Sequence, residues 1–228
     1  MRQLNRRLLI TVAACGLSMV GLSACSSAEE HKTKTVNYEE TAPVRTLVIK
    51  GTVGDIKVSG EATSVSVTEK HSYQTAEPVA SHSLVDGTYT LSYTCPDSKC
   101  GVDYTVQVPA GTAVQVTSET GDINLSKLTG GIGARTGTGR IEATDLSSPQ
   151  VQLTTDTGDV TAGFVKSPSS VSAKVSTGDV RIAVPAGQYA VDARSESGDV
   201  HVEVPQAADS SSKIIAKTDT GSVTVSNA

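Results

Sequence analysis

Two Asp-Thr-Gly triplets are the first residues in the chain whose types could do chemistry. Asp156-Thr157-Gly158 and Asp219-Thr220-Gly221 each place a carboxylate beside a tight turn. Two carboxylates that share one proton at hydrogen-bonding distance can hydrolyse a bond by general acid–base catalysis. The same position in four related segments holds Glu119, Gly137, Ser176 and Glu196. We therefore interpret it as a variable position beside a repeated turn and expect no protease activity.

A second set of carboxylates follows the turn glycines, at Asp55, Asp122, Asp159, Asp179 and Asp199. Stacked carboxylates bind calcium in glycine- and aspartate-rich β-rolls, which use a shorter repeat with two oxygen-rich corners per turn. Here each repeat offers one aspartate, and Arg140 and Ser222 replace it in two repeats. We interpret the aspartates as turn residues and expect no metal and no cofactor. A calcium ladder remains the alternative.

Other catalytic motifs are missing from the sequence. The segment from Gly130 to Gly139 is rich in glycine, but it has no Gly-Lys-Ser/Thr and no helical pattern after it, which excludes a phosphate-binding loop. There is no Gly-x-Ser-x-Gly and no His-Glu-x-x-His. His71, His82 and His201 stand alone at polar positions, where we expect solvated side chains.

A polysaccharide-acting β-helix is the enzymatic alternative. Such an enzyme clusters carboxylates in a groove along its stack of coils and usually adds aromatic platforms for sugar rings. The residues that could line this groove are Glu142, Arg181, His201 and Glu203. The repeat region has little aromatic content beyond Tyr189 and Phe164. We therefore expect no enzymatic activity.

An internal repeat supplies the elements that would position all these residues. Its turn glycines are Gly121, Gly139, Gly158, Gly178, Gly198 and Gly221, spaced by 18, 19, 20, 20 and 23 residues. A similar unit, Val53-Gly54-Asp55-Ile56, lies far upstream. Each repeat consists of a strand, a Thr/Ser-Gly-Asp turn and a second strand. Glycine supplies a positive φ at the turn, and the hydroxyl residue before it, such as Thr120, is expected to bond to the turn backbone.

Apolar residues recur at fixed distances from each glycine. Seven residues before it stand Val114, Ile132, Val151, Val171, Val191 and Ile214. Two residues after it stand Ile123, Ile141, Val160, Val180, Val200 and Val223. Four residues after it stand Leu125, Ala143, Ala162, Ile182, Val202 and Val225, and the intervening positions are polar. This alternation places the apolar set on one face of each strand, so that successive repeats stack the same side chains.

The regularity predicts an all-β solenoid over residues 44–228, with coils of about 19–20 residues. Consecutive coils would stack about 4.8 Å apart, in chain order. A β-sandwich of antiparallel hairpins remains the alternative. The chain has no Trp and one Phe, a composition that suits a thin core repeated many times.

The N-terminus has the pattern of an export signal. Arg2, Arg6 and Arg7 precede a short apolar run that ends at Leu22-Ser23-Ala24-Cys25, which resembles a bacterial lipobox. The resemblance implies cleavage before Cys25 and acylation of its thiol by palmitate-type chains. We divide the chain into a signal peptide (1–24), a flexible tether (25–43) and the solenoid domain (44–228). The protein is then extracytoplasmic and lipid-anchored at the cell surface, by the general or the twin-arginine export route.

Charge and cysteines narrow the partners and the compartment. Cleavage removes three of the 19 basic residues, and the remaining 16 stand against 24 acidic ones, a net charge of 16 − 24 = −8. An acidic body argues against nucleic acid as a partner. After Cys15 is removed and Cys25 acylated, Cys95 and Cys100 remain, and outside the cytoplasm such a pair predicts a disulfide.

The repeats and two further segments resemble those of bacterial adhesin-type domains of unknown function, a head-GIN-like group with Ser/Thr-Gly-Asp repeats. The resemblance rests on residues 53–58, on residues 104–111 and on the repeated turns. It implies a right-handed, single-stranded β-helix and brings no catalytic residues. We therefore expect a non-catalytic envelope lipoprotein that binds a cell-envelope polymer or protein. An envelope-stress sensor or accessory lipoprotein and a polysaccharide-acting enzyme are the alternatives.

Overall fold

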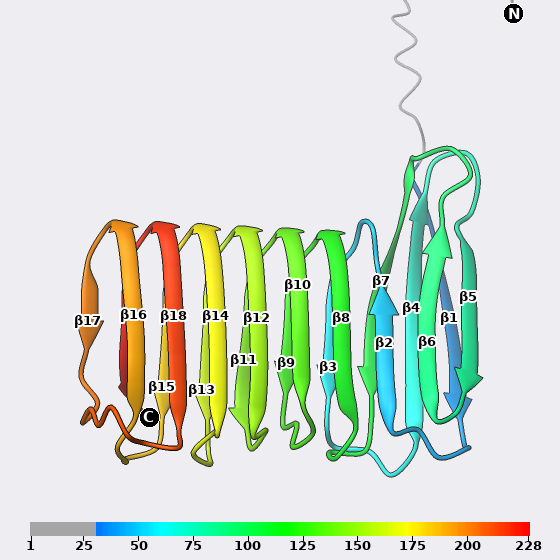
Figure 1. The fold of residues 1–228 in the computed structure, drawn as a ribbon. Coiled ribbons are helices and arrows are strands. Elements are labelled where there is room, and N and C mark those ends of the chain that lie inside the picture. The colour runs from blue at the N-terminus through cyan, green and yellow to red at the C-terminus, as the bar shows by residue number, and fades with distance from the viewer. Residues whose placement is uncertain (1–30) are drawn as a thin grey trace, which may run out of the picture.

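The computed structural model describes residues 31–228, which form two facing β-sheets (Figure 1). The signal peptide and Cys25 lie outside the described residues. Sheet A has ten strands, in the spatial order β1 (Lys32–Glu40), β4 (Val65–Tyr73), β7 (Cys100–Gln107), β3 (Ile56–Ser59), β9 (Ile123–Ser126), β11 (Ile141–Leu146), β13 (Val160–Phe164), β15 (Val180–Val184), β19 (Val223–Asn227) and β17 (Val200–Val202). Sheet B has nine, in the order β16 (Ala190–Ser197), β18 (Lys213–Thr220), β14 (Ser170–Thr177), β12 (Gln150–Thr157), β10 (Ile132–Thr138), β8 (Ala113–Thr120), β2 (Thr46–Lys50), β6 (Thr88–Thr94) and β5 (Val79–Val85).

Each coil contributes one strand to each sheet, and coils pair in parallel with their neighbours. Ile132 of β10, for example, pairs with Val114 of β8 on one side and with Val151 of β12 on the other. The parallel ladders confirm the predicted all-β solenoid and exclude a sandwich of antiparallel hairpins. Among residues 31–228 no helix is long and apolar enough to cross a bilayer.

The core lies between the two sheets and follows the predicted columns. Val114, Ile123 and Val180 are fully buried, as are most residues that share their positions in other coils. The exceptions belong to the coil that ends the stack: Val200 is 41% exposed, and Val191 and Val202 are partly buried. Alternation along each strand therefore separates core from surface as expected.

Coils do not stack in chain order at either end of the solenoid, which corrects our expectation. The last coil in sequence, β18/β19, inserts between β14/β15 and β16/β17. The first, β2/β3, likewise inserts between β6/β7 and β8/β9. At the C-terminal end the inner and outer coils carry nearly the same apolar set: Ile214 pairs with Val191 of the outer coil, and Val225 pairs with Val202.

The N-terminal end of the stack departs from the repeat. Strands β1, β4 and β7 pair antiparallel, as do β5 and β6, and in Figure 1 this end rises above the other coils. Residues 32–40, which we assigned to the flexible tether, are strand β1. Their alternation places Val36 and Tyr38 toward the core side, and Tyr38 stacks on His82 of β5 with ring centroids 4.8 Å apart. The pair bridges the two sheets at this end.

Candidate binding face

The predicted turn glycines form one column along a corner of the solenoid. Their φ angles lie between +131° and +145° from Gly54 to Gly221, a region that side chains disfavour. A Cβ on Gly158 would lie 2.2 Å from the carbonyl oxygen of Gly139 in the neighbouring coil. A Cβ on Gly121 or Gly139 would likewise lie 2.1 Å from the carbonyl oxygen of the glycine in the neighbouring coil. The corner therefore requires glycine both for its backbone angle and for the close approach of coils.

The turn aspartates form a hydrogen-bonded ladder between coils. The Asp122 N–H donates to Asp55 Oδ1 (2.9 Å), and the Asp179 N–H donates to Asp159 Oδ1 (2.9 Å). Where the motif departs from Asp, the backbone still donates: Arg140 N–H to Asp122 and Ser222 N–H to Asp179. The carboxylates are thus partners of backbone amides in the next coil. Among residues 31–228 no group of three or more His, Cys, Asp or Glu side chains is arranged to hold a metal ion.

The order of the corner column differs from our expectation in one place. Asp199 does not follow Asp179, because the inserted β18/β19 coil puts Ser222 between them. Arg181, on the outward side of β15, forms an ion pair with Asp179 (2.5 Å) and lies 3.9 Å from Asp159. Charge compensation at this corner therefore comes from the strand beside it.

A column of buried hydroxyls beside the corner was missed by sequence reasoning. Three residues before the glycine, Thr136, Thr155 and Thr218 each donate to the carbonyl oxygen of the neighbouring coil's glycine, over 2.8–3.1 Å. Ser195 does the same to Gly221. We had assigned this role to the residue directly before the glycine, which is exposed. The signal was available, since a hydroxyl residue recurs there at an inward position of the alternation.

Three of the four residues of the enzymatic alternative lie in one row but do not meet, and the fourth, Glu203, lies outside the row, just after β17. Glu142, Arg181 and His201 project outward from sheet A, in register along the stack. Thr161 lies between Glu142 and Arg181, and Thr224 lies between Arg181 and His201. The row therefore does not bring a carboxylate pair together.

The outer surface of sheet B has adjoining hollows, which we call the sheet-B face. One of about 580 Å3 spans β8, β10, β12 and β14 and is lined by Gln115, Gly133, Gln152 and Ser172 among others. A second of about 240 Å3 shares three of these residues. Gly133 carries no side chain, and the Gln115 amide lies over it. Amides and hydroxyls here offer both hydrogen-bond donors and acceptors without net charge.

Two charged rows run across the stack beside these hollows. The basic row is Lys50, Arg135, Lys174, Lys217 and Arg194, and the acidic row, two positions nearer the corner, is Glu119, Asp156, Asp219 and Glu196. Arg135 spans the rows, with both carboxylate oxygens of Asp156 3.0 Å from its Nη2. A third hollow of about 350 Å3 lies between the rows over β12, β14 and β18.

A buried charged cluster joins β1 to the domain and corrects our view of one histidine. His71 is only 3% exposed, and its ring nitrogens lie 3.0 Å from Glu69 and 3.0 Å from Glu77. Glu69, 1% exposed, also accepts a hydrogen bond from the Tyr38 hydroxyl. Burial and that contact raise the pKa of Tyr38. Hydrogen bonds from Lys34 and His71 hold the pKa of Glu77 below its usual range.

The alternation along β4 could have placed this cluster. Val65 and Val67 point inward, and the same phase puts Glu69 and His71 on the inward face. Buried charges of this kind persist when they are paired. His82 and His201 are exposed, as expected.

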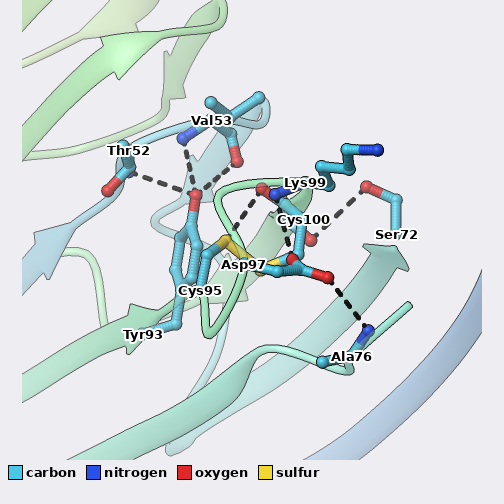
Figure 2. Close-up of a disulfide and its surroundings, with 10 residues drawn as sticks. Thr52, Val53, Ser72, Ala76, Tyr93, Cys95, Asp97, Lys99 and Cys100 are labelled. Carbon is cyan, nitrogen blue, oxygen red and sulfur yellow. Dashed lines mark hydrogen bonds between the residues drawn. A yellow bond between two sulfur atoms is a disulfide. The ribbon is translucent and has the colours of Figure 1, made fainter. Parts of the chain in front are cut away.

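The predicted cysteine pair is disulfide-bonded at the tip between β6 and β7 (Figure 2). Asp97 within the loop accepts hydrogen bonds from the Lys99 N–H and from the Ala76 N–H, which attaches the tip to a neighbouring segment. Nearby, the Tyr93 hydroxyl donates to the Val53 carbonyl (2.6 Å). The bridge thus stabilises the non-repetitive end of the domain.

Comparisons with known proteins agree with this architecture. The model of the family Toastrack DUF4097 matches residues 5–227. The chain is similar to a candidate cell adhesion protein from Clostridium sporogenes, with a TM-score of 0.54 and 14% identity, over 87% of this chain and 100% of that one. It is also similar to a candidate adhesin from Bacteroides fragilis, with a TM-score of 0.49 and 16% identity, over 86% and 97% of the two chains. No curated protein matches the sequence.

Proposed function

This chain belongs to the Toastrack DUF4097 family, and on that premise we propose that it is a non-catalytic, adhesin-like binding module of the cell envelope. The module is anchored outside the cytoplasm by a lipid on Cys25. It binds an extended envelope polymer through the sheet-B face. A structural neighbour named for cell adhesion supports the same general role.

The observation that carries this proposal is the run of hollows on the sheet-B face. Parallel strands about 4.8 Å apart hold outward side chains at a fixed spacing, so the face is rigid and periodic. The amides of Gln115 and Gln152 and the hydroxyl of Ser172 suit a ligand rich in hydroxyl groups. Such a ligand is a neutral glycan segment that lies across the strands.

The location outside the cytoplasm rests on two independent features of the chain. The Leu-Ser-Ala-Cys sequence at residues 22–25 has the pattern of a lipid attachment site. The Cys95–Cys100 disulfide suits an oxidising compartment. We expect Cys25→Ala to release the protein from the membrane fraction or to leave its signal uncleaved. A variant that is processed and remains membrane-bound contradicts the anchor.

A charged, bulky side chain in the hollow of about 580 Å3 tests the binding face. Ser172→Arg on β14 should reduce binding to purified envelope glycan at least tenfold, because the arginine fills the hollow. Thr161→Arg on β13 is the matched control, since it adds the same side chain at a half-buried outward position of sheet A. The measurement is sedimentation of the protein with insoluble glycan. If Ser172→Arg and Thr161→Arg both bind the glycan as strongly as the wild type does, the sheet-B face is not the binding face.

A further inference from the structure

The two ends of the solenoid differ in how they are finished. At the N-terminal end, the stacked rings of Tyr38 and His82 close the space between the sheets. The edge strand there, β1, is long and carries Lys32, Lys34 and Glu39. Charged edge strands of this kind resist pairing with other strands.

The C-terminal end has no comparable closure among the described residues. Strands β16 and β17 are the last strands of their sheets. Val200 is 41% exposed, whereas Val180 and Val223 in the same column are fully buried. Val191 and Val202 are only partly buried beside it. The apolar column therefore ends unfinished, where one more coil would cover it.

A short stretch of β16 offers the free backbone at this end. The Ala190 N–H points to β18, where it bonds to Ser212, so the alternating amides of Val191 and Ala193 face the open edge. Beside Tyr189 the edge is already occupied by Gln206. Gly198 turns the chain away at the other limit. The free stretch is thus residues 191–195, and Ala193 is its midpoint.

We propose that this open end binds a second copy of the chain across a two-fold axis. The axis passes through Ala193, so that β16 pairs antiparallel with β16 of the second copy. Because the axis is perpendicular to the sheets, it crosses sheet A just after β17, and the two copies of β17 lie on opposite sides of it. Each exposed Val200 then faces the segment that follows β17 in the second copy. The pairing occupies the C-terminal edge strands of both copies. It therefore gives a closed dimer and not a fibre.

The charges on β16 favour this register over its nearest neighbour, and Asp192 already forms ion pairs with Arg194 (2.7 Å) and Lys217 (2.8 Å) of its own chain. Antiparallel pairing about Ala193 places Asp192 opposite Arg194 of the second copy, and the same contact repeats across the axis. If the pairing were centred on Arg194 instead, the two copies of Arg194 would lie opposite each other and Asp192 would lie opposite Glu196. Like charges at opposed positions destabilise strand pairing. Head-to-tail stacking would instead meet the closed, charged β1 end. The inference is independent of what the sheet-B face binds.

Disulfide trapping of the anchored, full-length protein in cells tests the contact. Ala193→Cys should give a covalent dimer on mild oxidation, because the two copies of residue 193 face each other at the axis. Ala80→Cys on edge strand β5 is the matched control, since Ala80 is also half-buried on an edge strand but lies at the closed end. We expect no dimer from it. A dimer from both variants alike, or from neither, overturns the proposal.

A second experiment reverses the charges on β16 and measures dimer dissociation by sedimentation of the mature protein in detergent. Asp192→Arg and Arg194→Asp should each weaken the dimer at least tenfold, because each sets like charges against one another. The double variant should restore the affinity. Circular dichroism verifies that each variant is folded. The two-fold arrangement is overturned if the double variant is folded but dimerises as weakly as the single variants. It is also overturned if Ala193→Cys and Ala80→Cys chains form a mixed covalent dimer.

Discussion

The corner glycines make the sharpest test of how the coils hold together. We predict that Gly158→Ala strongly destabilises the domain. Its φ of +133° costs an alanine about 1–3 kcal/mol in backbone strain. The new Cβ would also lie 2.2 Å from the Gly139 carbonyl oxygen, about 1 Å inside ordinary contact.

Relief of that overlap must come from separation of the two coils. The backbone bond from the Gly139 N–H to the Thr157 oxygen and the bond from Thr155 Oγ1 to the Gly139 oxygen join these two coils at this corner. Loss of two such bonds costs about 1 kcal/mol each. Together with the strain, we expect a loss of about 3–5 kcal/mol in the free energy of unfolding, a large part of the ~5–15 kcal/mol of a typical domain.

Gly163→Ala is the matched control, because it lies in the adjacent strand β13 and a Cβ there meets nothing within 4 Å. It should be neutral or stabilising by up to about 1 kcal/mol. Urea unfolding followed by circular dichroism measures both variants. Similar free energies of unfolding for the two would refute the claim that the glycine column is required by the approach of neighbouring coils.

Three further predictions concern the corner, the core and the buried tyrosines. Asp179→Asn should leave the melting temperature nearly unchanged with calcium or with chelator, because an amide oxygen still accepts the Ser222 N–H; a loss seen only in calcium would favour the calcium ladder. Val180→Asp should cost at least several kcal/mol, since it buries an unpaired charge, while Thr224→Asp on the outward face of the adjacent strand should be nearly silent; equal melting curves would reverse the assigned faces. Burial raises the pKa of Tyr89 to about 12. Its phenol therefore stays neutral in the folded state while the unfolded chain ionises, so stability present below about pH 10 should fall as the pH rises from 10 to 12. Absorbance at 295 nm follows the titration, and a phenol that ionises near pH 10 without unfolding contradicts it.

Much of the fold was predictable from local pattern. The period-2 alternation identified the inward faces of the repeats, and the glycine spacing identified the coils, because both signals depend only on strand geometry and turn conformation. The disulfide followed from two cysteines close in sequence. The same alternation would have placed Glu69 and His71 inside, had it been applied to polar residues as strictly as to apolar ones.

Other features of the site required long-range contacts. The assignment of residues 32–40 to a tether was wrong because β1 is held by pairing with β4, and that pairing is invisible in the composition of the segment alone. The sheet-B face was not predicted as a site, because its hollows come from side chains of four different strands brought into register. The hydroxyl that bonds the turn was assigned to the wrong residue for the same reason: the carbonyl oxygen that accepts the bond lies in the neighbouring coil.

The sequence by itself determined the strands, their inward faces, the corners and the cysteine pair, all of which depend on residues within one coil. Only the tertiary structure decided the order of the coils. Every repeat presents nearly the same corner and the same alternation, so any coil can pair with any other at little local cost. The apolar sets of the two C-terminal coils differ little, since Ile214 pairs with Val191, one methylene smaller and worth about 0.8 kcal/mol, while Val225 pairs with Val202. The coil of β18 and β19 lies inside, and the coil of β16 and β17, which comes before it in the sequence, forms the open end.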